Sequence, residues 1–256
     1  MWTLLLALTA HGGEFTVLEP GLELARLDSP RKSSIGDSVI TVLRIDPEHW
    51  DLEVVAASKI APGESKTAKA WGEQTGMIAT INAGMYEMDH STATFWMKVG
   101  EHVNSTRWQT KAGSLMVLDG SGPDKIIDLR CEDGDAAKKA YPTQVQSYRM
   151  LNCSGEPAWK PSKRIWSHAS IGMDGSGRIL FIHARSPWST HDFAKILLEL
   201  PLDLKRLQYA EGGPEASLYV KEGDLELFGS FETGFVENDK NSRAWPIPNV
   251  IGVKAK

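Results

Sequence analysis

The stretch Ser38-Val39-Ile40-Thr41-Val42-Leu43-Arg44-Ile45 decides the fold class, because polar side chains interrupt its apolar side chains at short intervals. Such alternation predicts an antiparallel strand with one face on a core. The same pattern occurs at residues 22–29, 39–46 and 51–57. Working outward from there, we expect further strands at 94–99, 113–118, 144–151, 168–173, 179–184, 207–210 and 217–220.

Helices are few and lie far apart in the sequence. One is expected from Ser65 to Gln74 with Gly76 as its stop, and another over 190–199, capped by Ser189 or Thr190. A short helix is expected over 202–206. The run 77–82 reads as a buried strand. Strands outnumber helices, so the sequence predicts an α+β fold with a mixed, mainly antiparallel sheet core and a few helices.

Composition narrows the classes of protein without naming one. The 256 residues carry a formal net charge of −5, so no basic footprint for nucleic acid is present. After the N-terminus no run approaches the ~20 apolar residues of a membrane-spanning helix. No convincing linker is visible, so residues 14–256 are expected to form one domain.

The N-terminus suggests export. Residues 1–13 contain an apolar run that closes in Leu8-Thr9-Ala10, an ending similar to a signal-peptide cleavage site, although no Lys or Arg precedes it. A plain first strand is the alternative. We therefore expect a secreted or periplasmic protein of the cell envelope. Cys131 and Cys153 could pair in an exported protein and would be ordinary thiols in a cytosolic one.

Several kinds of chemistry lack their motifs. The chain has no GxSxG elbow, no Walker A loop, no GxGxxG after a strand and no HExxH. The seven histidines and two cysteines show no metal-ligand spacing. We therefore assign no cofactor and no metal.

The segment Glu211-Gly212-Gly213-Pro214-Glu215-Ala216-Ser217 is the main candidate for chemistry. It lies between two apolar runs and is expected to be a loop at a strand end. Adjacent glycines let the backbone approach a ligand closely. The two flanking carboxylates are suited to act as an acid/base or nucleophile pair. A tight turn with solvated charges is the alternative.

Other polar groups sit beside predicted strands. Asn82 and Gly84 follow the buried strand, where an amide could orient a polar substrate or simply serve turn geometry. Lys111 could be a solvated side chain, whereas Arg149 lies in an apolar stretch and would need an anionic partner, from the protein or from a ligand. His168 lies on a predicted strand and could be purely structural.

Read in order, these pieces resemble the phosphodiester glycosidase family over residues 20–252. The resemblance rests on the ordered series Ile81-Asn82-Ala83-Gly84-Met85-Tyr86, Lys111-Ala112-Gly113, Gln146-Ser147-Tyr148-Arg149, His168-Ala169-Ser170-Ile171-Gly172 and Glu211-Gly212-Gly213. Glu211 stands where the family pattern has Asp, and His168 stands where it has Arg. The Glu-Gly-Gly-Pro-Glu variant is similar to a bacterial branch of the family.

The resemblance implies a hydrolase that cleaves a sugar–phosphate bond. The leaving phosphate needs little protonation but should be held by cations, whereas a carboxylate serves the anomeric centre. The implied catalytic group is Glu211, Glu215 and His168. The implied substrate-binding residues are Asn82, Gly84, Lys111, Gln146, Ser147, Arg149, Arg185, Gly212, Gly213 and Ser217.

Two other functions stay open. A non-catalytic binder of envelope glycans or glycan-phosphate polymers would use the same cleft without an acid/base pair. A structural protein of the envelope would use the motifs only for folding. In that case the named side chains should diverge in space.

Overall fold

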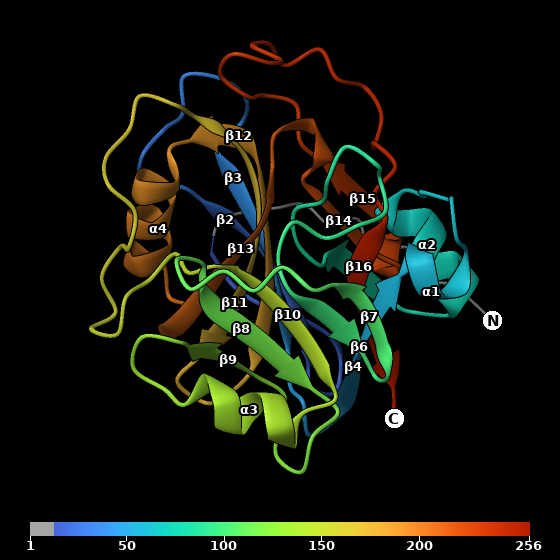
Figure 1. Cartoon of the computed structure of the whole chain (residues 1–256). Coiled ribbons are helices and arrows are strands. Elements are labelled where there is room, and N and C mark those ends of the chain that lie inside the picture. The colour runs from blue at the N-terminus through green and yellow to red at the C-terminus, as the bar shows by residue number, and fades with distance from the viewer. Residues whose placement is uncertain (1–12) are drawn as a thin grey trace, which may run out of the picture.

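The computed structural model describes residues 13–256, whose strands form three antiparallel sheets (Figure 1). The first, in spatial order, contains β1 (Thr16–Glu19), β2 (Leu22–Asp28), β3 (Val39–Ile45), β12 (Ile179–Trp188), β11 (Trp166–Asp174) and β13 (Leu204–Gly212). The second contains β7 (His102–Ser105), β6 (Met97–Val99), β10 (Thr143–Tyr148), β8 (Gly113–Leu118) and β9 (Lys125–Asp128). The third contains β15 (Leu225–Phe228), β14 (Ser217–Val220), β5 (Ala79–Asn82), β16 (Asn249–Ala255) and β4 (Trp50–Ala56).

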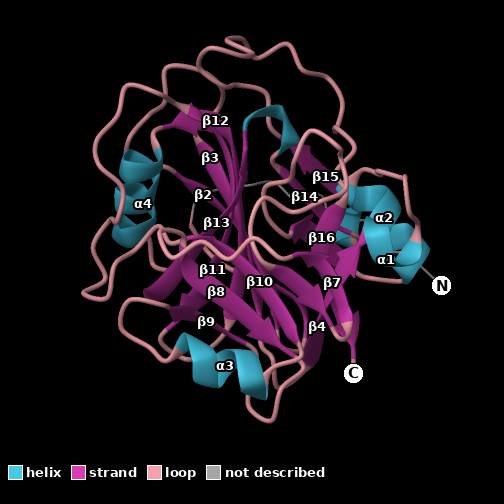
Figure 2. Ribbon diagram, in the orientation of Figure 1, coloured by secondary structure: helices cyan, strands magenta, loops and turns pink. Residues whose placement is uncertain are grey.

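The helices lie around the outside of the sheets (Figure 2). They are α1 (Ala57–Ile60), α2 (Ala68–Thr75), α3 (Gly134–Ala140) and α4 (Thr190–Glu199), with two short 3₁₀ helices, η1 (Gly213–Glu215) and η2 (Glu222–Asp224). The mainly antiparallel sheets with a few helices confirm the predicted α+β fold class. The single domain over 14–256 stays a prediction, and the predicted signal peptide, apart from Gly13, lies outside the described residues.

Two predicted helices form for the expected reasons. The Ser189 hydroxyl accepts a hydrogen bond from the backbone N–H of Asp192 at 3.1 Å, which caps α4, and its apolar face is buried. The Thr67 hydroxyl caps α2 by accepting a hydrogen bond from the backbone N–H of Ala70. The helix itself begins at Ala68, three residues after the predicted start at Ser65. Gly76 ends α2 in the left-handed conformation with φ of 73°, which glycine adopts without strain.

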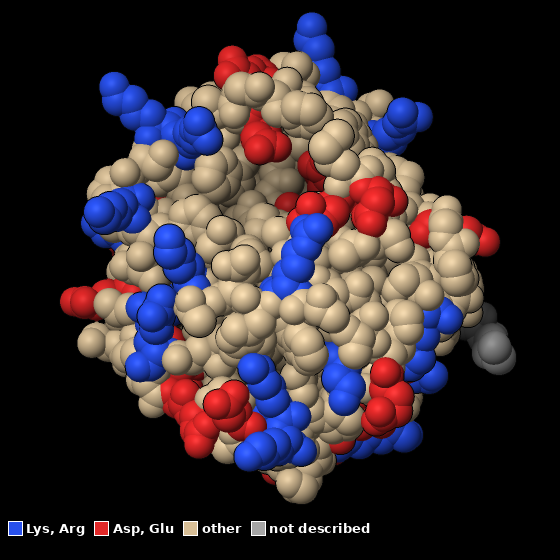
Figure 3. Space-filling view, viewed as in Figure 1, with Lys and Arg blue, Asp and Glu red and all other residues tan. Residues whose placement is uncertain are grey.

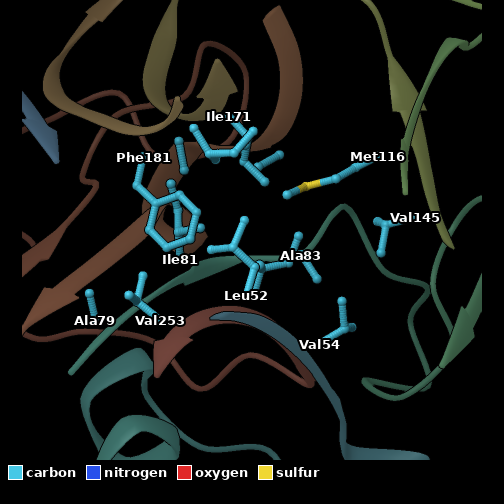
Figure 4. Close-up of a cluster of buried hydrophobic side chains, with 14 of the residues drawn as sticks. Leu52, Val54, Ala79, Ile81, Ala83, Met116, Val145, Ile171, Phe181 and Val253 are labelled. Atoms are coloured by element: carbon cyan, nitrogen blue, oxygen red, sulfur yellow. The ribbon is translucent and has the colours of Figure 1, made fainter. Parts of the chain in front are cut away.

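A shared apolar core joins the three sheets. Leu43 and Phe181 from the first sheet pack with Met116 from the second and with Ile81 and Val253 from the third (Figure 4 shows several of these side chains). Each sheet also buries apolar side chains against a helix: α4 on the first, α3 on the second and α2 on the third. The sheets are therefore held against one another, which fixes the strand ends that carry the candidate site.

The structure departs from the sequence-based prediction in places. In β3, Ile40 and Val42 face the cluster under α4, whereas Leu43 and Ile45 face the shared core, so this strand is buried on both faces. The helix predicted over 202–206 is wrong, since β13 begins at Leu204 and pairs with β11. The prediction also missed strands β1, β7, β9, β15 and β16 and helices α1 and α3.

Candidate functional site

The Glu211–Glu215 segment crosses from the first sheet to the third. Glu211 and Gly212 end β13, Gly213 to Glu215 form η1, and Ser217 begins β14. Gly213 has a φ of +66°, a left-handed conformation that favours glycine. Both Glu211 and Glu215 keep partial access to solvent. The crossover thus presents two carboxylates from a tightly turned backbone.

Asn82 at the end of β5 holds this crossover in place. Its Nδ2 donates to the carbonyl of Glu215 at 3.0 Å, and its Oδ1 accepts from the backbone N–H of Ser217 at 2.7 Å. The Ser217 hydroxyl donates to the same Glu215 carbonyl at 3.0 Å. Asn82 and Ser217 are both buried, as is Gly84 just beyond the strand. The polar contacts of Asn82 and Ser217 therefore position the Glu215 loop.

A third glutamate, which the sequence analysis did not assign, faces the same space. A Cβ added at Gly213 would lie 2.6 Å from Glu232 Oε2 and 3.4 Å from Glu215 Oε2, so these two oxygens are no more than about 6 Å apart. Glu232 comes from the long loop between β15 and β16. Nothing in its local sequence links it to the crossover, since only the packing of that loop brings it there.

The three carboxyl groups have raised pKa values. Burial, reinforced by the nearby charge of Glu215, raises the pKa of Glu211 well above its usual range. Burial, with a contribution from Glu232, raises the pKa of Glu215 to about 7, and burial also raises the pKa of Glu232. Within residues 13–256 none of the three forms a salt bridge. Such a cluster is suited to hold and transfer protons near neutral pH.

Aromatic side chains form a wall beside the carboxylates. A Cβ added at Gly212 would overlap the Tyr209 hydroxyl and lie 2.6 Å from the Trp166 ring, which explains the need for glycine there. The ring of Trp159 lies 5.8 Å from that of Tyr209 and 6.4 Å from that of Trp166. Burial, followed by the charges of Glu215 and Glu211, raises the pKa of Tyr86, so its phenol stays protonated. The sequence analysis assigned none of these four aromatic residues to the site.

Figure 3 shows a hollow in this face of the molecule, located between the upper ends of β13 and β14 as drawn in Figure 1. Acidic side chains lie inside the hollow and at its rim, and Lys and Arg side chains gather to its left. The surface therefore combines an acidic depression with a basic region beside it.

Lys111 and Arg149 come together in a separate pocket of about 440 Å³, also lined by Arg130, Tyr148 and Trp159. Arg149 donates through Nη1 to both carboxylate oxygens of buried Asp128, at 2.9 and 2.7 Å. The anionic partner that a partly buried arginine requires is therefore supplied by the protein itself.

Gln146 and Ser147 lie in β10 directly before Tyr148, which lines this pocket. Gln146 accepts from the backbone N–H of Gln109 at 2.9 Å and donates back to its carbonyl at 3.0 Å, which holds the segment before Lys111. Ser147 is fully buried, and its hydroxyl has no hydrogen-bond partner within residues 13–256. Neither side chain meets the carboxylates through a direct contact.

His168 pairs with Gly212 across β11 and β13, and its ring centroid lies 6.3 Å from that of Tyr209, but within residues 13–256 neither His168 nor Arg185 forms a hydrogen bond with Glu211 or Glu215. His168 is fully buried, stacks on Phe193 with ring centroids 4.3 Å apart and donates from Nε2 to the carbonyl of Trp188. Burial lowers its pKa to about 3, so it is neutral at pH 7 and carries no charge for a phosphate. Arg185 binds Asp239 and the carbonyls of Phe228 and Asn241, which ties down the loop that carries Glu232.

Cys131 and Cys153 form a disulfide next to Arg149. The sequence left open whether the two cysteines are paired or free, and in the structure they are paired. Disulfides persist outside the reducing cytoplasm, so this bond indicates an extracytoplasmic location. Among described residues, the group of potential metal ligands within mutual reach is Asp128 with these two cysteines, whose sulfurs are already bonded to each other. Within residues 13–256 no helix is long and apolar enough to span a bilayer.

Three solved structures share this fold. A hypothetical protein from Synechocystis aligns with a TM-score of 0.64 at 13% identity, covering 97% of this chain and 64% of that one, so the present chain spans less than two thirds of its length. The catalytic domain of zebrafish N-acetylglucosamine-1-phosphodiester α-N-acetylglucosaminidase, auto-inhibited by its pro-peptide, aligns with a TM-score of 0.66 at 10% identity over 96% of this chain and 87% of that one. A Burkholderia pseudomallei protein described as exported aligns with a TM-score of 0.52 at 9% identity over 84% and 73% of the two chains.

Comparison at the sequence level is more specific. No curated protein matches the chain. A family model described as phosphodiester glycosidase matches residues 75–254, a range that includes the Asn82 turn, the Lys111–Arg149 pocket, the Glu211–Glu215 crossover and Glu232. The chain belongs to the phosphodiester glycosidase family.

Proposed function

We propose that the protein is a secreted or periplasmic hydrolase that cleaves a glycosyl phosphodiester, with Glu211 and Glu215 at the anomeric centre. The observation that carries the proposal is the pairing of these two partly accessible carboxyl groups on one rigid crossover, with both pKa values raised. Family membership supports the reaction class, and the disulfide supports the location.

The chemistry suits this pair of groups. Water adds to the anomeric carbon while the bond from that carbon to the phosphate oxygen breaks, and the phosphate leaves as a monoester. Because Glu215 has a pKa of about 7, its ionised form is available near neutral pH to accept the proton of that water or to stabilise the developing positive charge. Burial raises the pKa of Glu211 well above its usual range, so its carboxyl group can hold a proton and pass it to the phosphate oxygen as that bond breaks.

The remaining residues are proposed to bind and position. Lys111 and Arg149 hold the phosphate from the neighbouring pocket, since oriented cations stabilise a leaving anion. Asn82 and Ser217 fix the Glu215 loop, and Gly212 and Gly213 keep the backbone close to the bound sugar. Assignment of His168 to catalysis stays a prediction. Its ring is fully buried and neutral at pH 7, so any catalytic role would not include a positive charge on this residue.

The test offers the purified chain a panel of sugar 1-phosphodiesters, beginning with an N-acetylglucosamine phosphodiester because the zebrafish enzyme is named for that group. Free sugar is measured, and binding is measured in parallel by calorimetry. Release of sugar from any member supports the proposal. Binding without release overturns it in favour of a non-catalytic binder of envelope glycans, and neither binding nor release points to a structural role.

A further inference from the structure

The pocket that Lys111 and Arg149 line is large enough for a small ligand and is basic. Its volume of about 440 Å³ falls in the range of small-ligand sites, about 300–1,000 Å³. Its lining combines the cations Lys111, Arg130 and Arg149 with the aromatic rings of Tyr148 and Trp159. Such a lining suits an organic anion, whose negative groups would bind the cations and whose carbon atoms would pack on the aromatic rings.

The charges in the pocket are unbalanced. Arg149 is compensated by the buried carboxylate of Asp128, 2.7 Å away. Lys111 and Arg130 are exposed, and within residues 13–256 neither side chain makes an ion pair or donates a hydrogen bond. Two positive charges therefore remain without a protein partner. A phosphodiester brings a single negative charge, which leaves one cation to be matched.

The walls of the pocket are held in place before any ligand arrives. The disulfide joins Cys131, which follows Arg130, to Cys153. The Trp159 indole donates to the carbonyl of Arg149 at 3.0 Å, and the Trp159 carbonyl accepts from His191 Nδ1 at 2.7 Å. A pocket fixed in this way loses little conformational entropy when it binds.

The pocket is also near enough to the carboxylates to take part of the same substrate. Trp159 lines it and packs against Tyr209, whose hydroxyl borders Gly212. The rings of Trp159 and Tyr209, with centroids 5.8 Å apart, therefore connect the pocket to the backbone next to Glu211. A substrate whose sugar lies at Glu211 would extend past this wall into the basic pocket.

We infer that this pocket binds a second anionic group of the substrate, with Arg130 as its specificity-determining residue. The inference rests on the proposed function, and it narrows the substrate class to glycosyl phosphodiesters that carry negative charge beyond the scissile bond, as oligomers of sugar phosphates or polyol phosphates do. Lys111, together with the Asp128-paired Arg149, binds the scissile phosphate, and Arg130 binds the next anion.

The test compares two matched substrates, the diesters of N-acetylglucosamine 1-phosphate with glycerol and with glycerol 3-phosphate. We expect kcat/KM to be about three- to fivefold higher for the second, the upper range of the effect of one solvent-exposed ion pair. Arg130→Ala should lower kcat/KM mainly for the glycerol 3-phosphate diester, so that the two diesters come to within about 1.5-fold of each other, and 0.5 M NaCl should weaken the preference in the wild type. Lys139→Ala, which removes an exposed cation outside the pocket, should keep the preference.

A second measurement separates this inference from the proposed function. Calorimetry of both diesters with Glu211→Gln protein, whose turnover is expected to be at least about 100-fold slower, measures binding in the pocket. If neither diester is hydrolysed but Arg130→Ala selectively weakens binding of the diester with two phosphate groups, the inference about the pocket stands and the hydrolase proposal fails. If both diesters are hydrolysed equally well, or the preference survives Arg130→Ala, the inference about the pocket is overturned while the hydrolase proposal stands.

Discussion

Replacing Glu215 by glutamine should stabilise the folded protein at pH 8, and the gain should shrink toward pH 5. In the folded chain the pKa of Glu215 is raised from 4.5 to about 7. The folded state therefore holds this proton more tightly than the unfolded state does. The stability that comes from the raised pKa is present below pH 4.5 and is lost as the pH rises to 7.

The size of the effect follows from the two pKa values. Integrating the proton linkage from pH 5 to pH 8 gives a loss of about 2.5 kcal/mol for this one group. Partial exposure of the Glu215 side chain brings the expected value to about 2 kcal/mol. Glutamine does not titrate, so Glu215→Gln should escape this loss.

The assay is urea denaturation of the wild type, Glu215→Gln and the control Glu48→Gln at four pH values from 5 to 8. Glu48 is exposed and lies outside the site. Buried His168 and His183, with pKa values lowered to about 3 and 4, make stability fall as the pH drops below 6.5. That opposite trend is shared by all three proteins and cancels in the difference. A difference between wild type and Glu215→Gln that stays flat from pH 5 to 8 would refute the reasoning.

Three further perturbations test other parts of the structure. Glu232→Gln removes a negative charge near Glu215. The pKa of Glu215, read from the acidic side of the pH profile of kcat/KM, should therefore fall by about half a unit to one unit, and an unchanged profile would show that the charge of Glu232 does not act on Glu215. Serine at both Cys131 and Cys153 opens a link across 22 residues and should cost about 3 kcal/mol in urea denaturation, whereas a cost near zero would show that the linkage leaves the unfolded chain unconstrained. Asn82→Ala leaves buried backbone groups unpaired and should cost about 2 kcal/mol and lower kcat, while wild-type kcat in a stable variant would deny it a positioning role.

Local patterns predicted the parts of the fold that local physics determines. The helix predicted over 190–199 with a Ser189 cap matches α4, whose buried Phe193, Ile196 and Leu197 lie at helical spacing. Residues 202–206 failed, because pairing of β13 with β11 outweighs a weak helix preference. β16 was missed although it is an inner strand that pairs with β4 and β5, since its place depends on partners far away in the sequence.

In the candidate site, too, features of the local sequence were predicted and contacts between distant segments were not. The glycine pair flanked by Glu211 and Glu215 is visible in the sequence, and so is the strand end at Asn82. Which groups meet in space was not visible. Glu232 reaches the site only through the packing of its loop, and the anionic partner of Arg149 is Asp128, a residue without any motif around it.

The central claim is that the Glu211 side chain takes part in breaking the sugar–phosphate bond. Its most direct test uses a glycosyl phosphodiester that the wild type cleaves and measures the initial rate of sugar release by the wild type, Glu211→Gln and Glu48→Gln. We predict wild-type release by Glu48→Gln and a rate at least about 100-fold lower for Glu211→Gln, the usual size of a lost acid/base group. Release by Glu211→Gln at the wild-type rate would contradict the account.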